Sequence, residues 1–253
     1  MKIDLNSDLG EGYGPWRMGE DAAILTVVTS ANVACGGHAS DPDTMVETLL
    51  LAQAQGVVVG AHPGYADPLA FGRRVIPMTP TEIERMVACQ IGALLGAAAL
   101  AGVPVTYVKA HGALANLGAD EPAVADAIAR ATAAVSRDLA LLAISGTELE
   151  GAGQRAGLAT YAEIFADRAY LPNGRLVPRS RAGAMITDAG VASARLIGFL
   201  QTGQMPTLDG AAIALKADSI CVHGDSAHAV AMAADIRNAL TAAGVTLAPF
   251  IAP

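Results

Sequence analysis

The chain has 253 residues, and its 16 Lys and Arg against 24 Asp and Glu give a formal net charge of -8. No basic cluster is longer than Arg73-Arg74, which argues against a nucleic-acid partner or an anionic membrane surface. The three cysteines form no C-x-x-C pair, so we expect no disulfide framework and a reduced, cytoplasmic location.

Short apolar runs alternate with longer helical segments along the chain. Strands are predicted near residues 2–8, 31–37, 57–62, 105–110, 139–144, 159–165 and 218–223. Helices with start signals are predicted over 43–55, 82–101, 123–136 and 189–202. This alternation implies parallel βαβ units. The amino-acid composition does not change along the chain in a way that would mark a second domain. The alternation therefore predicts one α/β barrel domain over residues 1–253, with a doubly wound open sheet as the alternative.

One uncharged stretch, Met86–Val108, is long enough to span a bilayer. Gln90 interrupts it, and Gly102-Val-Pro104 ends any helix before its last residues. It is therefore interpreted as a buried helix followed by a strand, and no membrane association is expected.

Four histidines each follow one of the short apolar runs. They are His38, His62, His111 and His223. The carboxyl ends of parallel strands meet at one end of a barrel, where barrel enzymes place their chemistry. Four distant segments that finish alike therefore predict one shared site.

Side-chain alternation predicts which polar residues join this site. In the first strand Lys2, Asp4, Asn6 and Asp8 share one face, and the outer face of a barrel strand must be apolar, so this row is expected to point inward. The same alternation groups Lys109 with His111, and Cys221 with His223 and Asp225.

Seven ordered motifs resemble the LamB/YcsF family. They are Asp4-Leu-Asn-Ser-Asp-Leu-Gly-Glu-Gly-Tyr-Gly14, Asn32-Val-Ala-Cys-Gly-Gly-His-Ala39, Gly60-Ala-His-Pro-Gly64, Phe71-Gly-Arg-Arg74, Val108-Lys-Ala-His-Gly-Ala-Leu114, Glu163-Ile-Phe-Ala-Asp-Arg-Ala-Tyr170 and Ile220-Cys-Val-His-Gly-Asp225. The sequence departs from the family pattern at Ala110, where Pro is usual, and at Ala115, where Tyr is usual. Both changes flank Lys109 and His111, so they bear on the shape of the pocket.

The resemblance implies a seven-stranded, TIM-like β/α barrel of the glycoside hydrolase/deacetylase type. It also implies ATP-dependent opening of the 5-oxoproline lactam to L-glutamate, carried out with two partners, 5-oxoprolinase subunits B and C. The chain contains no G-x-x-x-x-G-K-[ST] phosphate loop, and its glycine-rich stretch 151–157 falls in a helical segment. ATP would therefore bind an unconventional surface or a partner, and self-association of the barrel is left open.

Lactam opening needs an activated water, a stabilised oxyanion and a protonated leaving nitrogen. The catalytic candidates are Asp8, Glu11, His62, Lys109 and His111. The candidates for substrate binding are Asn6, His38, Arg73, Arg74, Arg168, His223 and Asp225. Lys109 and Arg74 are the residues expected to hold phosphate or carboxylate charge.

A divalent metal is the main alternative to purely organic chemistry. The candidate ligands are Asp8, His38, His62, His111 and His223, although no H-x-x-x-H or H-E-x-x-H spacing supports a local site. Three hypotheses remain: one component of a 5-oxoprolinase complex, a stand-alone metal-dependent deacetylase or amidohydrolase, and a non-catalytic subunit that binds a small acid. Cys35 and Cys221 lie in no motif of a cysteine hydrolase, so a nucleophilic thiol is disfavoured.

Overall fold

Seven parallel strands close into a barrel in the computed structural model, which describes residues 1–224 and 226–252. The strands are β1 (Lys2–Leu9), β2 (Ser30–Ala34), β3 (Val58–His62), β4 (Val105–Val108), β5 (Ala140–Ile144), β6 (Thr160–Phe165) and β9 (Ser219–Cys221). They pair in this order, and β9 pairs back onto β1 with Asp4 opposite Ser219. The predicted seven-stranded β/α barrel is confirmed, and the open-sheet alternative is wrong.

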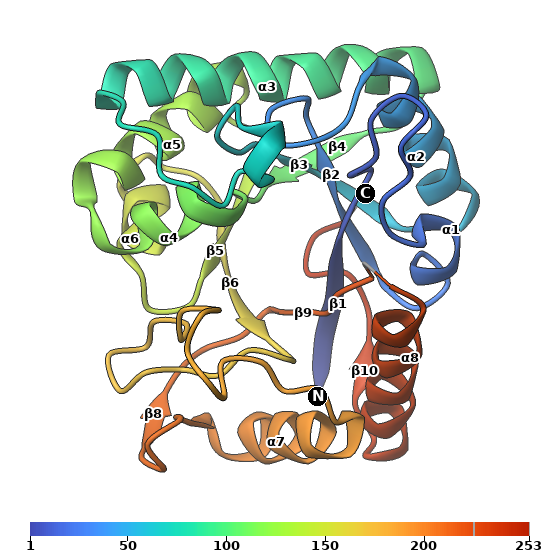
Figure 1. Cartoon of the computed structure of the whole chain (residues 1–253), viewed down its shortest axis with the longest axis vertical. Coiled ribbons are helices and arrows are strands. Elements are labelled where there is room, and N and C mark those ends of the chain that lie inside the picture. The colour runs from blue at the N-terminus through green and yellow to red at the C-terminus, as the bar shows by residue number, and fades with distance from the viewer. Residues whose placement is uncertain (225, 253) are drawn as a thin grey trace.

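Helices surround the strands on all sides in Figure 1, with α3 along the top and α7 at the bottom. They are α1 (Asp21–Ile24), α2 (Pro42–Ala54), α3 (Pro80–Ala101), α4 (Gly112–Asp120), α5 (Pro122–Val135), α6 (Glu148–Arg155), α7 (Ala189–Thr202) and α8 (Ala227–Ala242), with a 3₁₀ turn η1 (Pro68–Ala70). The four predicted helices correspond to α2, α3, α5 and α7. The glycine-rich stretch 151–157 begins inside α6, so it does not open a helix after a strand.

Capping explains where several helices start. The Asp41 carboxylate accepts from the backbone N–H groups of Asp43 and Thr44 at the start of α2. Thr79 and Glu82 form a reciprocal capping box at the start of α3. At α7, Asp188 Oδ1 accepts from the backbone N–H of Val191 at 2.8 Å. These oxygens satisfy N–H groups that a helix start leaves without an intrahelical partner.

Several short elements were not predicted. Helix α4 begins directly after His111, and a hairpin of β7 (Gln204–Pro206) and β8 (Ala212–Ala214) interrupts the path from α7 to β9. Strand β10 (Thr246–Leu247) pairs with the first residues of β1. Elements of two or three residues carry too little periodicity to be separated from loops.

Helix α3 lies in the ring of helices around the barrel, where it packs against α2 and α5 (Figure 1). Within the described residues it is the one helix long and apolar enough to cross a membrane, by length and composition only. Such a helix is weak evidence for a span, because core helices pass the same test. Its inner stripe of Ile83, Val87, Ile91 and Leu94 is buried, as expected for a helix that covers a sheet.

The inward row of β1 is polar and mostly buried, as predicted. Asp4 and Asn6 are fully buried, whereas Lys2 at the start of the strand is exposed. Asp4 accepts hydrogen bonds from Thr29, Ser30 and Ser219 inside the barrel. Burial raises the pKa of this carboxyl to about 6, and the three hydroxyl donors only partly offset that effect.

The Asp4→Asn variant is expected to change the pH dependence of stability. A carboxyl whose pKa is raised by folding stabilises the native state below its unfolded pKa of 3.8, and that contribution is lost as pH rises through about 6. The gap corresponds to about 3 kcal/mol. Urea unfolding between about pH 4 and pH 7 should show the free energy of unfolding falling less steeply in the variant. Parallel pH profiles for the two proteins would contradict this assignment.

Candidate active site

A cavity of about 810 Å³ opens at the carboxyl ends of the barrel strands. Its lining includes the predicted catalytic residues Asp8, Glu11, His62, Lys109 and His111. They follow or end β1, β3 and β4, so the barrel topology brings together residues that lie far apart in the sequence. The site is at the end of the barrel where parallel strands expose their last side chains.

Lys109 lies between two carboxylates. Its Nζ is 3.0 Å from Asp8 Oδ1 and 2.8 Å from Glu163 Oε1. It also donates to Asn6 Oδ1 at 3.1 Å. Both carboxylates line the cavity, but the Glu163 side chain is 1 % exposed and that of Asp8 is 20 % exposed, so Asp8 is the more accessible of the two. Asn6 does not line the cavity; it supports Lys109 from inside the barrel.

The pKa values of Asp8 and Glu11, which both line the cavity, are shifted in opposite directions. Burial opposes ionisation of Asp8, but His62 and Lys109 outweigh it and hold the pKa of Asp8 well below its usual range. Burial, followed by the negative charge of Asp8, raises the pKa of Glu11 well above its usual range. Burial lowers the pKa of Lys109, but the surrounding carboxylates, led by Asp8, raise it well above normal. One pocket therefore combines a carboxyl whose ionised form is favoured, a carboxyl whose protonated form is favoured and a lysine whose charged form is favoured.

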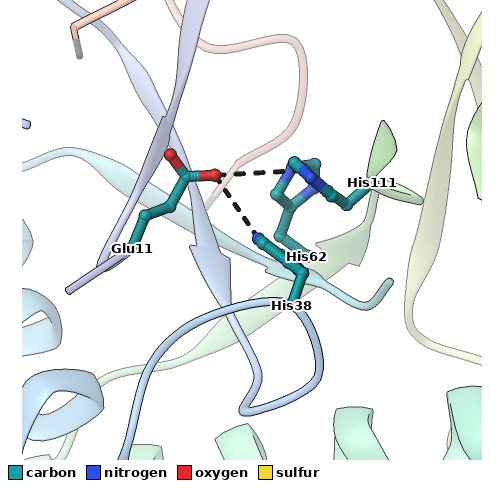
Figure 2. Close-up of side chains that lie close together, drawn as sticks. All are labelled: Glu11, His38, His62 and His111. Atoms are coloured by element: carbon teal, nitrogen blue, oxygen red, sulfur yellow. Dashed lines mark hydrogen bonds and ion pairs between the residues drawn. The ribbon is translucent and has the colours of Figure 1, made fainter. Parts of the chain in front are cut away.

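Glu11 and three histidines form a compact group, shown in Figure 2. One donor atom from each of Glu11, His38, His62 and His111 lies within 4.8 Å of the others. Glu11 Oε1 is 3.4 Å from His38 Nε2 and 3.9 Å from His111 Nδ1. The His38 and His111 rings are stacked with centroids 3.6 Å apart. His38 is thus packed behind the cavity and contacts Glu11.

Backbone carbonyls fix the tautomers of His62 and His111. His62 Nδ1 donates to Lys109 O at 2.7 Å, and His111 Nε2 donates to Phe71 O at 2.9 Å. The remaining nitrogens, His62 Nε2 and His111 Nδ1, are 3.0 Å apart. In two neutral rings both would be lone pairs, so this pair of nitrogens is placed to share a proton or a cation. Burial, followed by His62, lowers the pKa of His111 to about 3.

The loop after β3 holds this arrangement in place. Phe71, whose carbonyl accepts from His111, has a left-handed φ of 55°. Gly72 follows with φ +61°, and a Cβ there would lie 2.7 Å from His38 Cβ and 3.0 Å from His111 Cδ2. A bulky residue with positive φ is strained, and such strain is concentrated at functional sites.

Arg74 lies outside the cavity, unlike Arg73, which lines it. The guanidinium of Arg74 makes two hydrogen bonds to Asp67, at 2.9 and 2.6 Å, and its side chain is 65 % exposed. Its interactions tie together the loop that carries Phe71. Among the predicted site residues that the structure describes, none is given a hydrogen bond or ion pair with Arg74.

His223 and Arg168 lie on another part of the cavity wall. His223 Nδ1 is 2.5 Å from Asp167 Oδ2, and its Nε2 is 3.3 Å from Arg179 Nη2. His223 does not belong to the group of Glu11 and the three other histidines. Arg168 donates to the Val177 carbonyl at 2.7 Å. Asp225 lies outside the described residues.

The two thiols considered as nucleophiles are buried and disfavoured as thiolates. Burial raises the pKa of Cys35 to about 12 and that of Cys221 well above its usual range. Cys221 Sγ lies 3.4 Å from Lys109 Nζ. Since the thiolate is the reactive form, neither cysteine is prepared to attack a substrate.

Two residues that matter for the site were not nominated from the sequence. Glu163 is a charged residue inside the apolar strand β6, which was a usable signal because a buried charge needs a partner. Arg179 lies in the long segment between β6 and α7, where no strand end points to the cavity. The two departures from the family pattern, Ala110 and Ala115, both line the cavity.

The closed barrel and the acid–base group at its mouth define a barrel protein with a hydrolase-type centre. The family model described as LamB/YcsF family matches residues 3–252, and the chain belongs to this family. The expected family is thereby confirmed.

Three known proteins are similar to this chain in sequence or in structure. It is 49% identical over 245 residues to the A subunit of 5-oxoprolinase from Gluconobacter oxydans (strain 621H), covering 97% of this chain and 96% of that protein. The crystal structure of a lactam utilization protein from Thermus thermophilus matches with TM-score 0.92 and 42% identity, over 98% of this chain and 99% of that chain. The T48 deacetylase with substrate matches with TM-score 0.50 and 14% identity, over 98% of this chain and 87% of that chain, which supports the fold alone.

Proposed function

We propose that this chain, acting as one barrel domain over residues 1–253, is the A subunit of an ATP-dependent 5-oxoprolinase. Together with subunits B and C, it opens the lactam of 5-oxo-L-proline to L-glutamate while ATP is hydrolysed to ADP and phosphate. The single observation that carries the proposal is the cavity that brings Asp8, 3.0 Å from Lys109 Nζ, together with Glu11 and the histidines. The pKa shifts of Asp8 and Glu11, in opposite directions, agree with it. The similarity to the 5-oxoprolinase A subunit of Gluconobacter oxydans supports the choice of substrate.

The three groups divide the work of amide hydrolysis. Asp8 accepts a proton from water as the water oxygen adds to the ring carbonyl carbon. Lys109, 3.0 Å from Asp8, supplies positive charge near the developing oxyanion. Glu11 donates a proton to the ring nitrogen as the C–N bond breaks, so the nitrogen leaves as the amine of glutamate. His38 and His111 orient Glu11, and His62 orients Asp8.

ATP transfers its γ-phosphoryl group to the carbonyl oxygen of the lactam and leaves as ADP, which makes the ring carbon easier to attack. After the C–N bond breaks, a second water hydrolyses the resulting acyl phosphate to the carboxylate and phosphate. The ATP-binding site belongs to the complex. Arg73, which lines the cavity beside Phe71, is the residue proposed to hold the carboxylate of the substrate. The three cysteines of the chain are free, in keeping with a reduced cytoplasmic location.

The experiment is glutamate formation from 5-oxo-L-proline by the purified chain, alone and with subunits B and C, with and without ATP. Glutamate is expected only when both partners and ATP are present. Folded, partner-bound protein that yields no glutamate with ATP would refute the proposal.

The Glu11 and histidine group also fits a divalent cation. Three imidazoles and a carboxylate are a donor set that zinc and similar metals accept. The N–H groups of His62 and His111 that face away from the group donate to backbone carbonyls, an arrangement usual behind metal-bound histidines. Glu11, His38, His62 and His111 would hold the ion, which would polarise a carbonyl or acidify a bound water. This observation favours, as a second candidate function, a metal-dependent amidohydrolase that needs no ATP.

Metal content is a direct test of this second candidate. The purified chain, dialysed against zinc and then against buffer, should retain zinc in elemental analysis, and His62→Ala should lose it. His228→Ala is the matched control, because His228 is exposed on α8. Equal zinc retention by the wild type and both variants would exclude a specific ion in the group. Activity that chelation abolishes and that ATP does not affect would favour the amidohydrolase.

A further inference from the structure

Three arginines line the cavity from the segment that follows β6: Arg168, Arg175 and Arg179. Arg175 is already held by the Asp120 carboxylate and the Gly146 carbonyl. Arg168 is 7% exposed, and its Nη2 donates to Val177 O at 2.7 Å. Its buried Nε has no hydrogen-bond partner among the described residues. A buried charged donor without an acceptor is costly, so this guanidinium is incompletely satisfied by the protein.

Arg179 faces the same part of the cavity with neutral contacts. Its Nη1 is 3.4 Å from Met185 Sδ, and its Nη2 is 3.3 Å from His223 Nε2. Because His223 Nδ1 donates to Asp167, Nε2 of the neutral ring is the acceptor for Arg179. Among residues 1–224 and 226–252, the contacts given for the Arg179 guanidinium are with a thioether and an imidazole.

The like charges of Arg168 and Arg179 line the same cavity. Burial, followed by the charge of Arg179, lowers the pKa of Arg168 to about 10. Asp167 is the carboxylate that acts in the opposite direction, and it is already engaged by His223. An anion of charge near -2 would relieve the repulsion and provide acceptors for both guanidiniums.

We propose that Arg168, Arg179 and His223 form a subsite for a phosphoryl group in the cavity, next to the acid–base centre. This inference rests on the proposed function, since ATP-dependent lactam opening supplies a phosphoryl group as phosphorylated lactam, phosphate or nucleotide. It also changes an expectation from the sequence, which gave this role to Lys109 and Arg74.

The position of the subsite suits a substrate with two anionic ends. Lys109 Nζ contacts Cys221 Sγ at 3.4 Å, and Cys221 precedes His223 by two residues at the end of β9. The subsite therefore lines the same cavity as Lys109, and Arg73 lines that cavity beside Phe71. A cavity of about 810 Å³ is much larger than a small cyclic amide requires and leaves room for a phosphoryl group.

The test is calorimetric titration of the full chain with inorganic phosphate. Arg179→Ala removes an exposed guanidinium. Arg168→Lys keeps the buried positive charge but loses the planar guanidinium and its paired N–H donors. Each should weaken phosphate binding about ten-fold or more, the effect of losing a charge-assisted hydrogen bond. Arg130→Ala is the matched control, since Arg130 pairs with Glu84 on the exposed surface, and it should bind phosphate as the wild type does.

A parallel titration with ATP separates the sources of the phosphoryl group. Phosphate binding tighter than ATP binding would assign the subsite to phosphorylated lactam or released phosphate. Tighter ATP binding that Arg179→Ala removes would assign it to the nucleotide, and both results uphold the subsite. No phosphate binding, or equal binding by wild type, Arg179→Ala and Arg168→Lys, would overturn it.

The steady-state kinetics of the assembled complex distinguish this inference from the proposed function. Glutamate formation by the wild type with phosphate binding unaffected by either substitution would refute the subsite and leave the proposed function standing. Phosphate binding that depends on Arg168 and Arg179, without any glutamate from the complex, would uphold the subsite and refute the proposed function.

Discussion

Asp8→Asn is expected to lower the rate of glutamate formation by the assembled complex about 10²- to 10⁴-fold, the range for loss of a general base. Asparagine keeps the size of the side chain but cannot accept a proton from water. Lys109 retains its ion pair with Glu163 at 2.8 Å, so the fold should survive the change. The measurement is kcat for glutamate release at saturating ATP, together with Tm of the isolated chain.

A matched control for Asp8→Asn is Asp126→Asn. Asp126 pairs with Arg155 on the exposed surface between α5 and α6, so its replacement should leave kcat unchanged. An Asp8→Asn complex that turns over like the wild type, with the variant folded, would remove Asp8 from the role of base and leave the Glu11 and histidine group as the remaining source of chemistry.

The barrel and the convergence of its strand ends could be predicted from the sequence for a physical reason. Buried parallel strands are short apolar runs, and the polar residues that end them must meet at one rim. Asp8, His62, Lys109 and His111 were therefore placed together without any coordinates, and the structure brings them into one cavity.

Individual contacts were much less predictable. Arg74 and Arg73 are neighbours in the sequence, yet only Arg73 lines the cavity, because Asp67 seven residues earlier engages Arg74. Asn6 was expected to bind substrate but lies beneath Lys109, since alternation gives the face of a strand and not the depth of a residue in the barrel. Arg179 comes from an irregular segment, where no periodicity fixes the direction of a side chain.

The division of protonation states was also beyond the sequence. Asp8 and Glu11 are three residues apart, and nothing in their order says which one is ionised. The answer depends on the distance from Asp8 to Lys109 and on the burial of Glu11, both of which are products of the fold.

Lys109→Met is expected to lower the free energy of unfolding by about 3–5 kcal/mol, the usual cost of removing one partner from a buried ion pair. Methionine fills the space of the lysine stem, but Glu163, which is 1 % exposed, loses its counterion. For a chain of this size the loss corresponds to a Tm lower by about 6–20 °C in thermal unfolding. The pKa of Glu163, already raised by burial, would rise further in the variant.

The sign of the pH dependence identifies the cause of this loss. A raised pKa at Glu163 favours the folded state at low pH, and that contribution is lost as pH rises through the folded pKa. The Tm deficit of Lys109→Met should therefore be smaller near about pH 5 than near about pH 8. Adding Glu163→Gln to Lys109→Met removes the unpaired charge and should restore most of the lost Tm at the higher pH. If the double variant melts as low as Lys109→Met at both pH values, lost packing around the lysine stem and not the charge of Glu163 explains the destabilisation.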